Sequence, residues 1–64
     1  NAISPGGIFR NQPEKFVKKY NSKTPLARMA TEDDIRGAIT YLATDLSSYV
    51  TGQNLAVDGG WGVW

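Results

Sequence analysis

Few side chains in this sequence can do acid–base, nucleophilic or metal chemistry. The 64 residues contain no Cys and no His, which removes thiol nucleophiles and imidazole metal ligands. Two glycine-bearing segments stand out, Pro5-Gly6-Gly7 and Asp58-Gly59-Gly60. An Asp-Gly-Gly run could suggest a metal or phosphate site, but it is more typical of a turn that ends a strand. We therefore predict no metal site, and Pro5-Gly6-Gly7 taken alone is also simplest as a turn.

Five positive charges lie between residues 10 and 23, at Arg10, Lys15, Lys18, Lys19 and Lys23. They could meet an anionic ligand, but cations along a short exposed helix are more often a solvated face. The whole chain has 7 Lys and Arg against 6 Asp and Glu, and the two signs are interspersed. We therefore expect no nucleic-acid partner and no anionic membrane surface. The apolar stretches are also too short to span a membrane.

The elements that would position these residues begin with an extended piece at 1–3, which runs into the Pro-Gly-Gly turn. A short helix is predicted next, with Asn11 as its N-cap, Pro13 in its first turn and Glu14 three residues after the cap. One face of this helix carries Phe16, Val17 and Tyr20. The segment 21–28, which contains Pro25, is predicted to be a mobile connection over the surface.

The strongest local signal starts a longer helix at Thr31. The Thr31 hydroxyl can cap it and Asp34 stands three residues later, which is the spacing of a capping box. An apolar stripe then follows at helical period to a helix end near Asp45, and consists of Ile35, Ala38, Ile39, Leu42 and Ala43. Residues 49–51 favour β structure, and 54–57 are predicted to form a strand that the Asp58 turn ends.

The predicted order is strand end, short helix, longer helix and strand, which usually gives parallel strands. Parallel sheets need both faces covered, and one longer helix cannot cover both. A chain of 64 residues without disulfides also buries too little surface for much stability of its own. The fold class is therefore predicted as α/β, a slice of a larger parallel sheet. The start Asn-Ala-Ile-Ser has no initiator Met or signal-peptide pattern, and it is expected to be a cut end.

Four blocks of sequence resemble the C-terminal quarter of classical short-chain dehydrogenases/reductases: Asn-Ala-Ile-Ser-Pro-Gly-Gly-Ile (1–8), Pro-Leu-Ala-Arg-Met-Ala (25–30), Glu-Asp-Asp-Ile-Arg-Gly-Ala-Ile (32–39) and Ser-Ser-Tyr-Val-Thr-Gly-Gln-Asn-Leu-Ala-Val-Asp-Gly-Gly-Trp (47–61). The resemblance implies that residues 1–64 are the C-terminal part of one NAD(P)-binding, Rossmann-like doubly wound domain. It also implies an oxidoreductase that transfers hydride between NAD or NADP and a carbonyl or alcohol substrate.

The resemblance further implies roles for particular residues. Pro5, Gly6, Gly7 and Ile8 would form the wall beside the nicotinamide, with the Ile8 backbone on the carboxamide. A glycine-rich turn suits this role because its main chain can approach a flat ring closely. The segment from 9 to about 28 would be the substrate lid, and its candidate residues are Phe9, Arg10, Phe16 and Tyr20. The family often has Thr where this chain has Arg10, so that hydroxyl contact to the cofactor is not expected.

Catalytic residues of the family, an upstream Ser and a Tyr-x-x-x-Lys pair, have no match in these residues. Tyr20 is followed by Lys23 at a spacing of three rather than four, and neither Tyr41 nor Tyr49 has a Lys at either spacing. The glycine fingerprint for the cofactor phosphates is absent too. The chain alone is thus expected to be inactive, and the substrate and the choice between NAD and NADP stay open.

The last helix and strand of the family commonly pack against a neighbouring subunit, which implies a homo-oligomer, a tetramer or a dimer. Trp61 and Trp64 are expected to be buried in a core or a subunit contact. The absence of Cys is compatible with a cytoplasmic protein. Two alternatives stay open, a non-catalytic interaction or oligomerisation module and an inactive truncated remnant.

Overall fold

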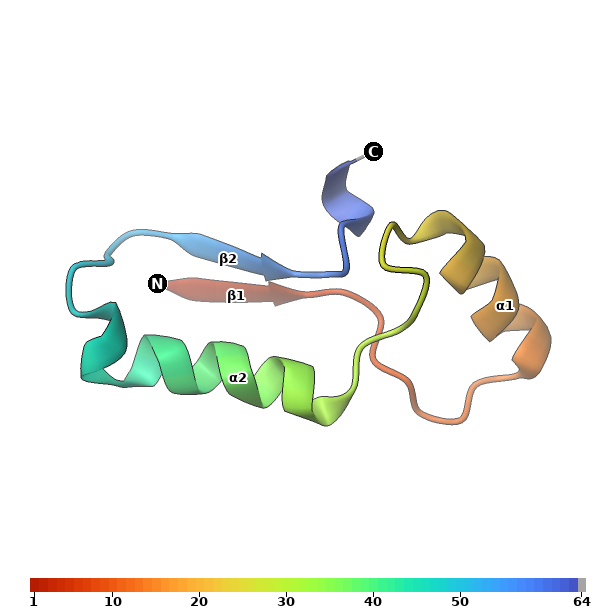
Figure 1. The fold of residues 1–64 in the computed structure, drawn as a ribbon, viewed down its shortest axis with the longest axis horizontal. Helices are drawn as coiled ribbons and strands as arrows, with labels where there is room; N and C mark the ends of the chain where they lie inside the picture. Colours follow the sequence, from red (N-terminus) through yellow and green to blue (C-terminus); the bar gives the residue numbers. More distant parts are fainter. Residues whose placement is uncertain (64) are drawn as a thin grey trace.

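The computed structural model describes residues 1–63, which form a two-stranded parallel sheet, two α-helices and two short 3-10 helices (Figure 1). Their order along the chain is β1 (Ala2–Pro5), α1 (Glu14–Lys23), α2 (Glu32–Ala43), η1 (Asp45–Ser47), β2 (Asn54–Val57) and η2 (Trp61–Val63). The α/β class, the parallel pair and the order of elements predicted from the sequence are confirmed. The predicted bounds of β2 are also those observed.

The strand register explains how a proline is accommodated in β1. Ala2 pairs with Asn54 and Pro5 with Val57. The amides of Ala2 and Gly6 donate to the carbonyls of Gln53 and Val57, at 2.8 and 2.9 Å. Because amides of a strand alternate in direction, those of even-numbered residues face β2 and the nitrogen of Pro5 faces away from it. The missing N–H of Pro5 therefore costs the ladder nothing.

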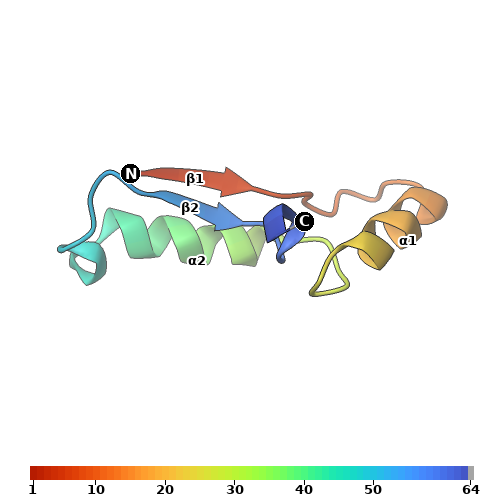
Figure 2. The same ribbon diagram turned by 90° about the horizontal axis from the view of Figure 1, so that it is seen from above.

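The α2 helix begins with the capping box that the sequence predicts. The Thr31 side chain accepts from the amide of Asp34, and the Asp34 carboxylate accepts from the amide of Thr31 at 2.7 Å. The acidic residues of the first turn also complement the helix dipole. The helix lies along both strands on one face of the sheet (Figures 1 and 2), as its apolar stripe requires.

Little of the apolar surface of residues 1–63 is buried. Met29, with 7% of its surface exposed, is the one apolar residue among 1–63 that is buried. Ile35, Ala38 and Leu42 on α2 are half-buried, while Ile39 of the same stripe is 51% exposed. The molecule measures 41 × 24 × 14 Å, so it is little thicker than the spacing of two packed layers of about 10 Å. Within residues 1–63, no helix covers the second face of the strands (Figure 2).

The start of α1 differs from the prediction. Pro13, not Asn11, occupies the N-cap position, and no side chain caps this end of the helix. Asn11 instead has a φ of 59°, in the left-handed region that Asn tolerates better than most residues. Gln12 organises the approach to the helix, because its Oε1 accepts from the amide of Arg10 at 2.7 Å and its Nε2 donates to the carbonyl of Ile8 at 2.9 Å. Gln12 therefore holds the loop before α1, and the helix itself begins without a side-chain cap.

One further local prediction holds in part and another is wrong. The segment 21–28 was expected to be a surface connection, and residues 25–28 are indeed exposed and outside any helix or strand. However, α1 continues to Lys23, and Thr24, with 5% of its surface exposed, is buried. Residues 49–51 form no strand. The amide of Val50 instead donates to the carbonyl of Ser47 at 2.9 Å. This bond continues the turn after η1 and overrides the β preference of residues 49–51.

Candidate functional site

In the turn after β1, every backbone amide of residues 6–9 except one donates a hydrogen bond within the described residues. The amide of Gly6 donates to Val57, that of Gly7 to the Tyr20 hydroxyl at 2.7 Å, and that of Phe9 to Ala30 at 2.8 Å. Within residues 1–63, the amide of Ile8 makes no hydrogen bond. The turn therefore presents one free backbone donor, flanked by amides whose directions are fixed.

The pairing with Ala30 sets the direction of this donor. Ile8 and Ala30 form a parallel bridge, in which Ala30 donates to the carbonyl of Gly7 at 2.8 Å and accepts from Phe9. In such a bridge the bonds come from the residues flanking Ile8, so the N–H and C=O of Ile8 itself point away from Ala30. The Ile8 carbonyl accepts from Gln12 and keeps a second lone pair. A donor and an acceptor on one residue can together bind a primary amide.

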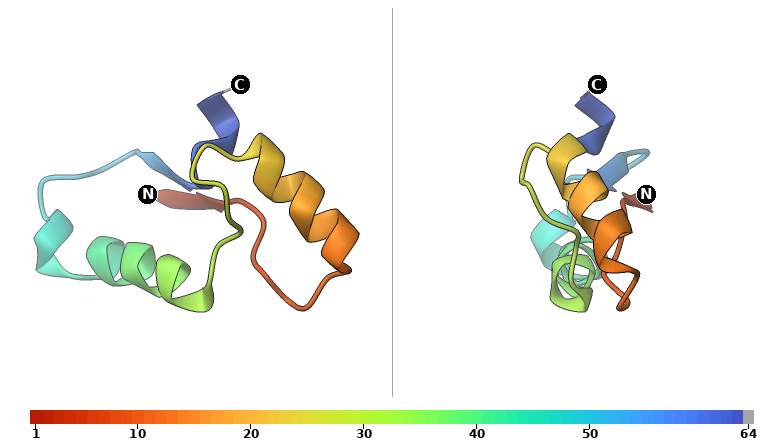
Figure 3. Two further views of the ribbon diagram at one scale, coloured as in Figure 1. Left: turned by 45° about the vertical axis from the view of Figure 1, so that its right-hand side comes forward. Right: turned by 90° about the vertical axis from the view of Figure 1, so that its right-hand side faces the viewer.

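Tyr20 connects three parts of the chain. It follows Phe16 by four residues on α1, so the two rings lie on one helix face, with centroids 6.4 Å apart. Its ring stacks on Trp61 at 4.7 Å and an interplanar angle of 15°, and its hydroxyl accepts from Gly7. The last turn of α1 and η2 accordingly lie side by side beyond the ends of the strands (Figure 3). Of the two tryptophans expected at a core or subunit contact, Trp61 is 40% exposed within this chain, and Trp64 lies outside the described residues.

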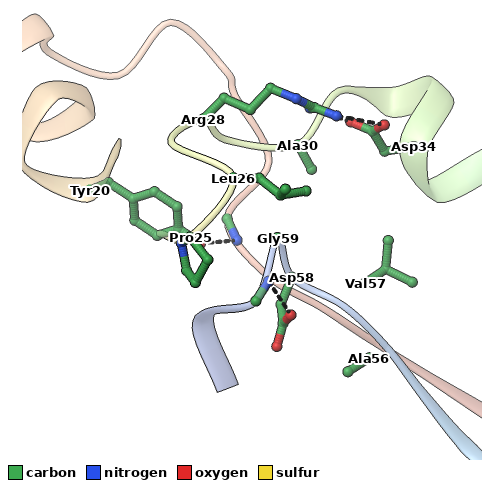
Figure 4. A pocket seen from close by; sticks show the side chains of 12 residues that line it. Tyr20, Pro25, Leu26, Arg28, Ala30, Asp34, Ala56, Val57, Asp58 and Gly59 are labelled. Atoms are coloured by element: carbon green, nitrogen blue, oxygen red, sulfur yellow. Dashed lines mark hydrogen bonds and ion pairs between the residues drawn. The ribbon is translucent and has the colours of Figure 1, made fainter. Parts of the chain in front are cut away.

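A cavity of about 460 Å³ opens beside this junction (Figure 4). Its walls come from Gly7, from Tyr20, from the connection between α1 and α2, and from the end of β2. Pro25 and Leu26 make one side apolar, and the Arg28–Asp34 pair lies at another (Figure 4). Asp58 also lines it, but its carboxylate accepts from the amides of Gly60 and Gly62, at 2.9 and 3.1 Å. Asp58 is therefore part of a turn, as predicted.

The ion pair between Arg28 and Asp34 ties the connection to the start of α2. The guanidinium donates to both carboxylate oxygens, at 2.8 and 3.2 Å. This hydrogen bonding from Arg28, followed by that from the Thr31 amide and hydroxyl, holds the pKa of Asp34 well below its usual range. The same pairing raises the pKa of Arg28. Because the Asp34 carboxylate already accepts from Arg28 and Thr31, its role in this structure is to hold the connection between α1 and α2 in place.

The residues predicted from the sequence as a site are only partly brought together. Gly7 and Tyr20 are in direct contact and both line the cavity. Phe9 and Phe16 are 49% and 53% exposed, and Arg10 is exposed as well; none of these three lines the cavity. Pro5, Gly6 and Ile8 lie next to the cavity in sequence but not on its wall.

Sequence reasoning did not identify Gln12 and Ala30, which fix the backbone on either side of Ile8. Nothing in the local sequence marks the pairing of Ala30 with the turn, because it depends on how α2 and β1 are packed. The proximity of Gln12 to the glycine turn is the one signal that could have indicated its role.

No helix within residues 1–63 is long and apolar enough to cross a membrane. The same residues hold no group of three or more Asp or Glu side chains placed to bind a metal ion.

Comparison with known proteins places these features in a family. The family model described as enoyl-(acyl carrier protein) reductase matches residues 1–62. The post-translational flagellin modification protein A of Campylobacter coli is 41% identical over 98% of this chain, and the sorbose reductase of Schizosaccharomyces pombe is 43% identical over 95% of it. The chain spans about a quarter of the length of these relatives, 25% and 26% respectively.

Solved structures agree with the sequence relatives. A short chain dehydrogenase from Leptospira borgpetersenii with bound NAD+ superposes with a TM-score of 0.86 at 54% identity, over 92% of this chain and 23% of that one. A putative NAD(P) dependent gluconate 5-dehydrogenase from Beutenbergia cavernae with bound NADP also gives 0.86, at 35% identity over 98% and 28%. At these identities the likeness concerns the family as well as the fold. The chain belongs to the short-chain dehydrogenase/reductase family.

Proposed function

We propose that these residues work as the C-terminal portion of an NAD(P)-dependent oxidoreductase that transfers hydride between a nicotinamide cofactor and a carbonyl or alcohol substrate. The observation that carries the proposal is the unpaired Ile8 amide in a glycine turn whose other amides are committed. Two solved structures that this chain resembles hold NAD+ and NADP. The cofactor's carboxamide has the donor and acceptor groups that the Ile8 backbone complements.

The turn fits a nicotinamide in three respects. Gly6 and Gly7 have no side chains, so a flat ring can approach the main chain closely. The nitrogen of Pro5 carries no hydrogen and leaves no unpaired donor beside such a ring. The N–H and C=O of Ile8 lie on one residue and point away from Ala30. When bound, the cofactor supplies the hydride donor or acceptor, and this chain's part is to orient its carboxamide.

The segment after the turn is proposed to act as the substrate lid. Phe9, Arg10 and Phe16 are exposed on it, and Tyr20 joins it to the turn. Exposed aromatic rings beside a cofactor wall could enclose an organic substrate and exclude water from the reacting carbon. The catalytic Ser and Tyr-x-x-x-Lys are proposed to come from residues outside 1–64, because no Tyr here has Lys at that spacing.

The exposed apolar surface supports a role within a larger assembly. On and after α2, Ile39, Leu46 and Tyr49 are 51%, 77% and 102% exposed, and Leu55 of β2 is 37% exposed. We propose that the remainder of the domain and a second copy of the protein cover this surface, giving a homo-oligomer. The rival proposal, a non-catalytic interaction module, rests on the same exposed surface and differs in requiring no cofactor.

Two measurements separate these proposals. The first is the coding sequence upstream of Asn1, in which the oxidoreductase requires a glycine-rich nucleotide motif, a Ser and Tyr-x-x-x-Lys. The second is turnover by the intact polypeptide with NADH and NADPH on ketoses, and with NAD+ and NADP+ on polyols. This panel is chosen because relatives include a sorbose reductase and an NADP-dependent mannitol dehydrogenase. An intact polypeptide that binds neither dinucleotide would leave the interaction module as the better account.

A further inference from the structure

The hydrogen bond from the Gly7 amide to the Tyr20 hydroxyl joins the lid to the turn beside it. The bond is 2.7 Å long, part-buried and formed across 13 positions of sequence. The Tyr20 ring is held in place by two aromatic contacts, one with Trp61 and one with Phe16 on the same helix. A ring fixed in this way presents its hydroxyl to Gly7 in a defined position.

The backbone around Gly7 shows what this hydroxyl controls. The peptide plane between Gly7 and Ile8 is held at its carbonyl end, where the Gly7 oxygen accepts from the amide of Ala30 at 2.8 Å. In a trans peptide the Ile8 N–H points opposite to that carbonyl. The preceding plane, between Gly6 and Gly7, is fixed at its N–H by Tyr20. Glycine restricts rotation between two peptide planes less than any other residue, so Gly7 by itself does not fix the angle between them.

We propose that Tyr20 is a positioning residue for the cofactor, which acts through Gly7 to aim the unpaired Ile8 amide at the nicotinamide carboxamide. This inference rests on the proposed function. Tyr20 touches neither cofactor nor substrate in this role; it holds the backbone that does. Because Tyr20 belongs to α1, the same bond makes the position of the lid helix and the geometry of the cofactor wall dependent on each other.

The test uses Tyr20→Phe in the intact oxidoreductase, since Phe keeps the ring on Trp61 and removes only the hydroxyl. Tyr49→Phe is the matched control, because Tyr49 is 102% exposed and its hydroxyl makes no hydrogen bond within the described residues. Two probes are titrated by calorimetry: the reduced dinucleotide that the wild-type protein binds, and the ADP-ribose portion of that dinucleotide. The second probe lacks the nicotinamide and so does not report on the wall.

We expect Tyr20→Phe to raise the dissociation constant of the dinucleotide by about five- to tenfold, the scale of one lost hydrogen bond. The dissociation constant of the ADP-ribose probe should change less than about twofold, and Tyr49→Phe should match wild type with both. Equal weakening of both probes would make Tyr20 merely structural and overturn the proposal, as would no weakening of either. A wild-type protein that binds neither probe overturns the proposed function itself, and this inference with it.

Discussion

The α-carbon of Gly7 faces the ring of Tyr20 so closely that a β-carbon there would lie 2.8 Å from Cζ and 2.9 Å from Cε2. The ring is also stacked on Trp61 with a centroid distance of 4.7 Å, and that contact would have to change if the ring moved. We therefore predict that Gly7→Ala destabilises the intact protein by about 1–3 kcal/mol, the usual cost of overpacking. Unfolding in urea measures this loss.

A double-mutant cycle tests whether the stability lost in Gly7→Ala is caused by the Tyr20 ring. Tyr20→Leu replaces the ring with a smaller side chain and leaves space for the new methyl group. In that background Gly7→Ala should cost at least about 1 kcal/mol less than in the wild-type background. Equal costs in the two backgrounds would show that the strain arises elsewhere in the turn.

At Gly37 on α2, substitution by alanine is expected to stabilise the protein. A β-carbon there would meet no atom within 4 Å, and alanine is a better helix former than glycine. Gly37→Ala should therefore raise the free energy of unfolding by about 0.5–1 kcal/mol. Urea unfolding of the intact protein measures this as well. A loss of stability would indicate that another surface closes on α2 at Gly37.

The local parts of the fold could be predicted from the sequence because their causes are local. Thr31 and Asp34 stand at capping-box spacing and close the predicted box. The strand 54–57 ends at the turn of Asp58, whose carboxylate binds the amides that follow it. In both cases the interacting groups are within four residues of each other, so the sequence pattern contains the whole interaction.

The site depends on contacts that a sequence pattern does not contain. Tyr20 meets Gly7 and Trp61 only because α1 folds back over the ends of the strands. The Asn11 cap was predicted from spacing alone, yet the neighbouring Gln12 has the longer side chain and reaches the Ile8 carbonyl. Spacing alone therefore did not decide between Asn11 and Gln12, and it did not contain the contacts of Tyr20.

Two glycines with positive φ allow strain and packing to be measured separately. Gly52 and Gly60 have φ values of 68° and 93°, so alanine at either should cost about 1–2 kcal/mol in backbone strain. A β-carbon on Gly52 would meet nothing within 4 Å, whereas one on Gly60 would lie 2.8 Å from Cγ of Pro25. Gly60→Ala should therefore be the more destabilising by a further ~1–3 kcal/mol. Similar unfolding midpoints for the two variants would contradict the contact with Pro25.

The pairing of Arg28 with Asp34 predicts an acid-dependent loss of stability. The pKa of Asp34 is lowered from its ordinary value of 3.8, first by the Arg28 side chain and then by Thr31. A carboxyl group with a lowered pKa in the folded state stabilises that state at every pH above its unfolded value. This stabilisation is lost progressively as the pH falls below about 4, because the unfolded chain then takes up a proton at Asp34 that the folded protein does not hold.

Asp34→Asn should therefore lower stability at pH 7, and its difference from wild type should shrink as the pH is reduced from 5 to about 3. Urea midpoints at each pH, measured on the intact protein, give this difference directly. Arg28→Gln removes the largest cause of the shift while leaving the carboxyl group in place, so most of the same pH dependence should disappear with it. If the Arg28→Gln protein keeps the wild-type profile below pH 5, the capping hydrogen bonds from Thr31, and not the ion pair, hold the carboxylate ionised.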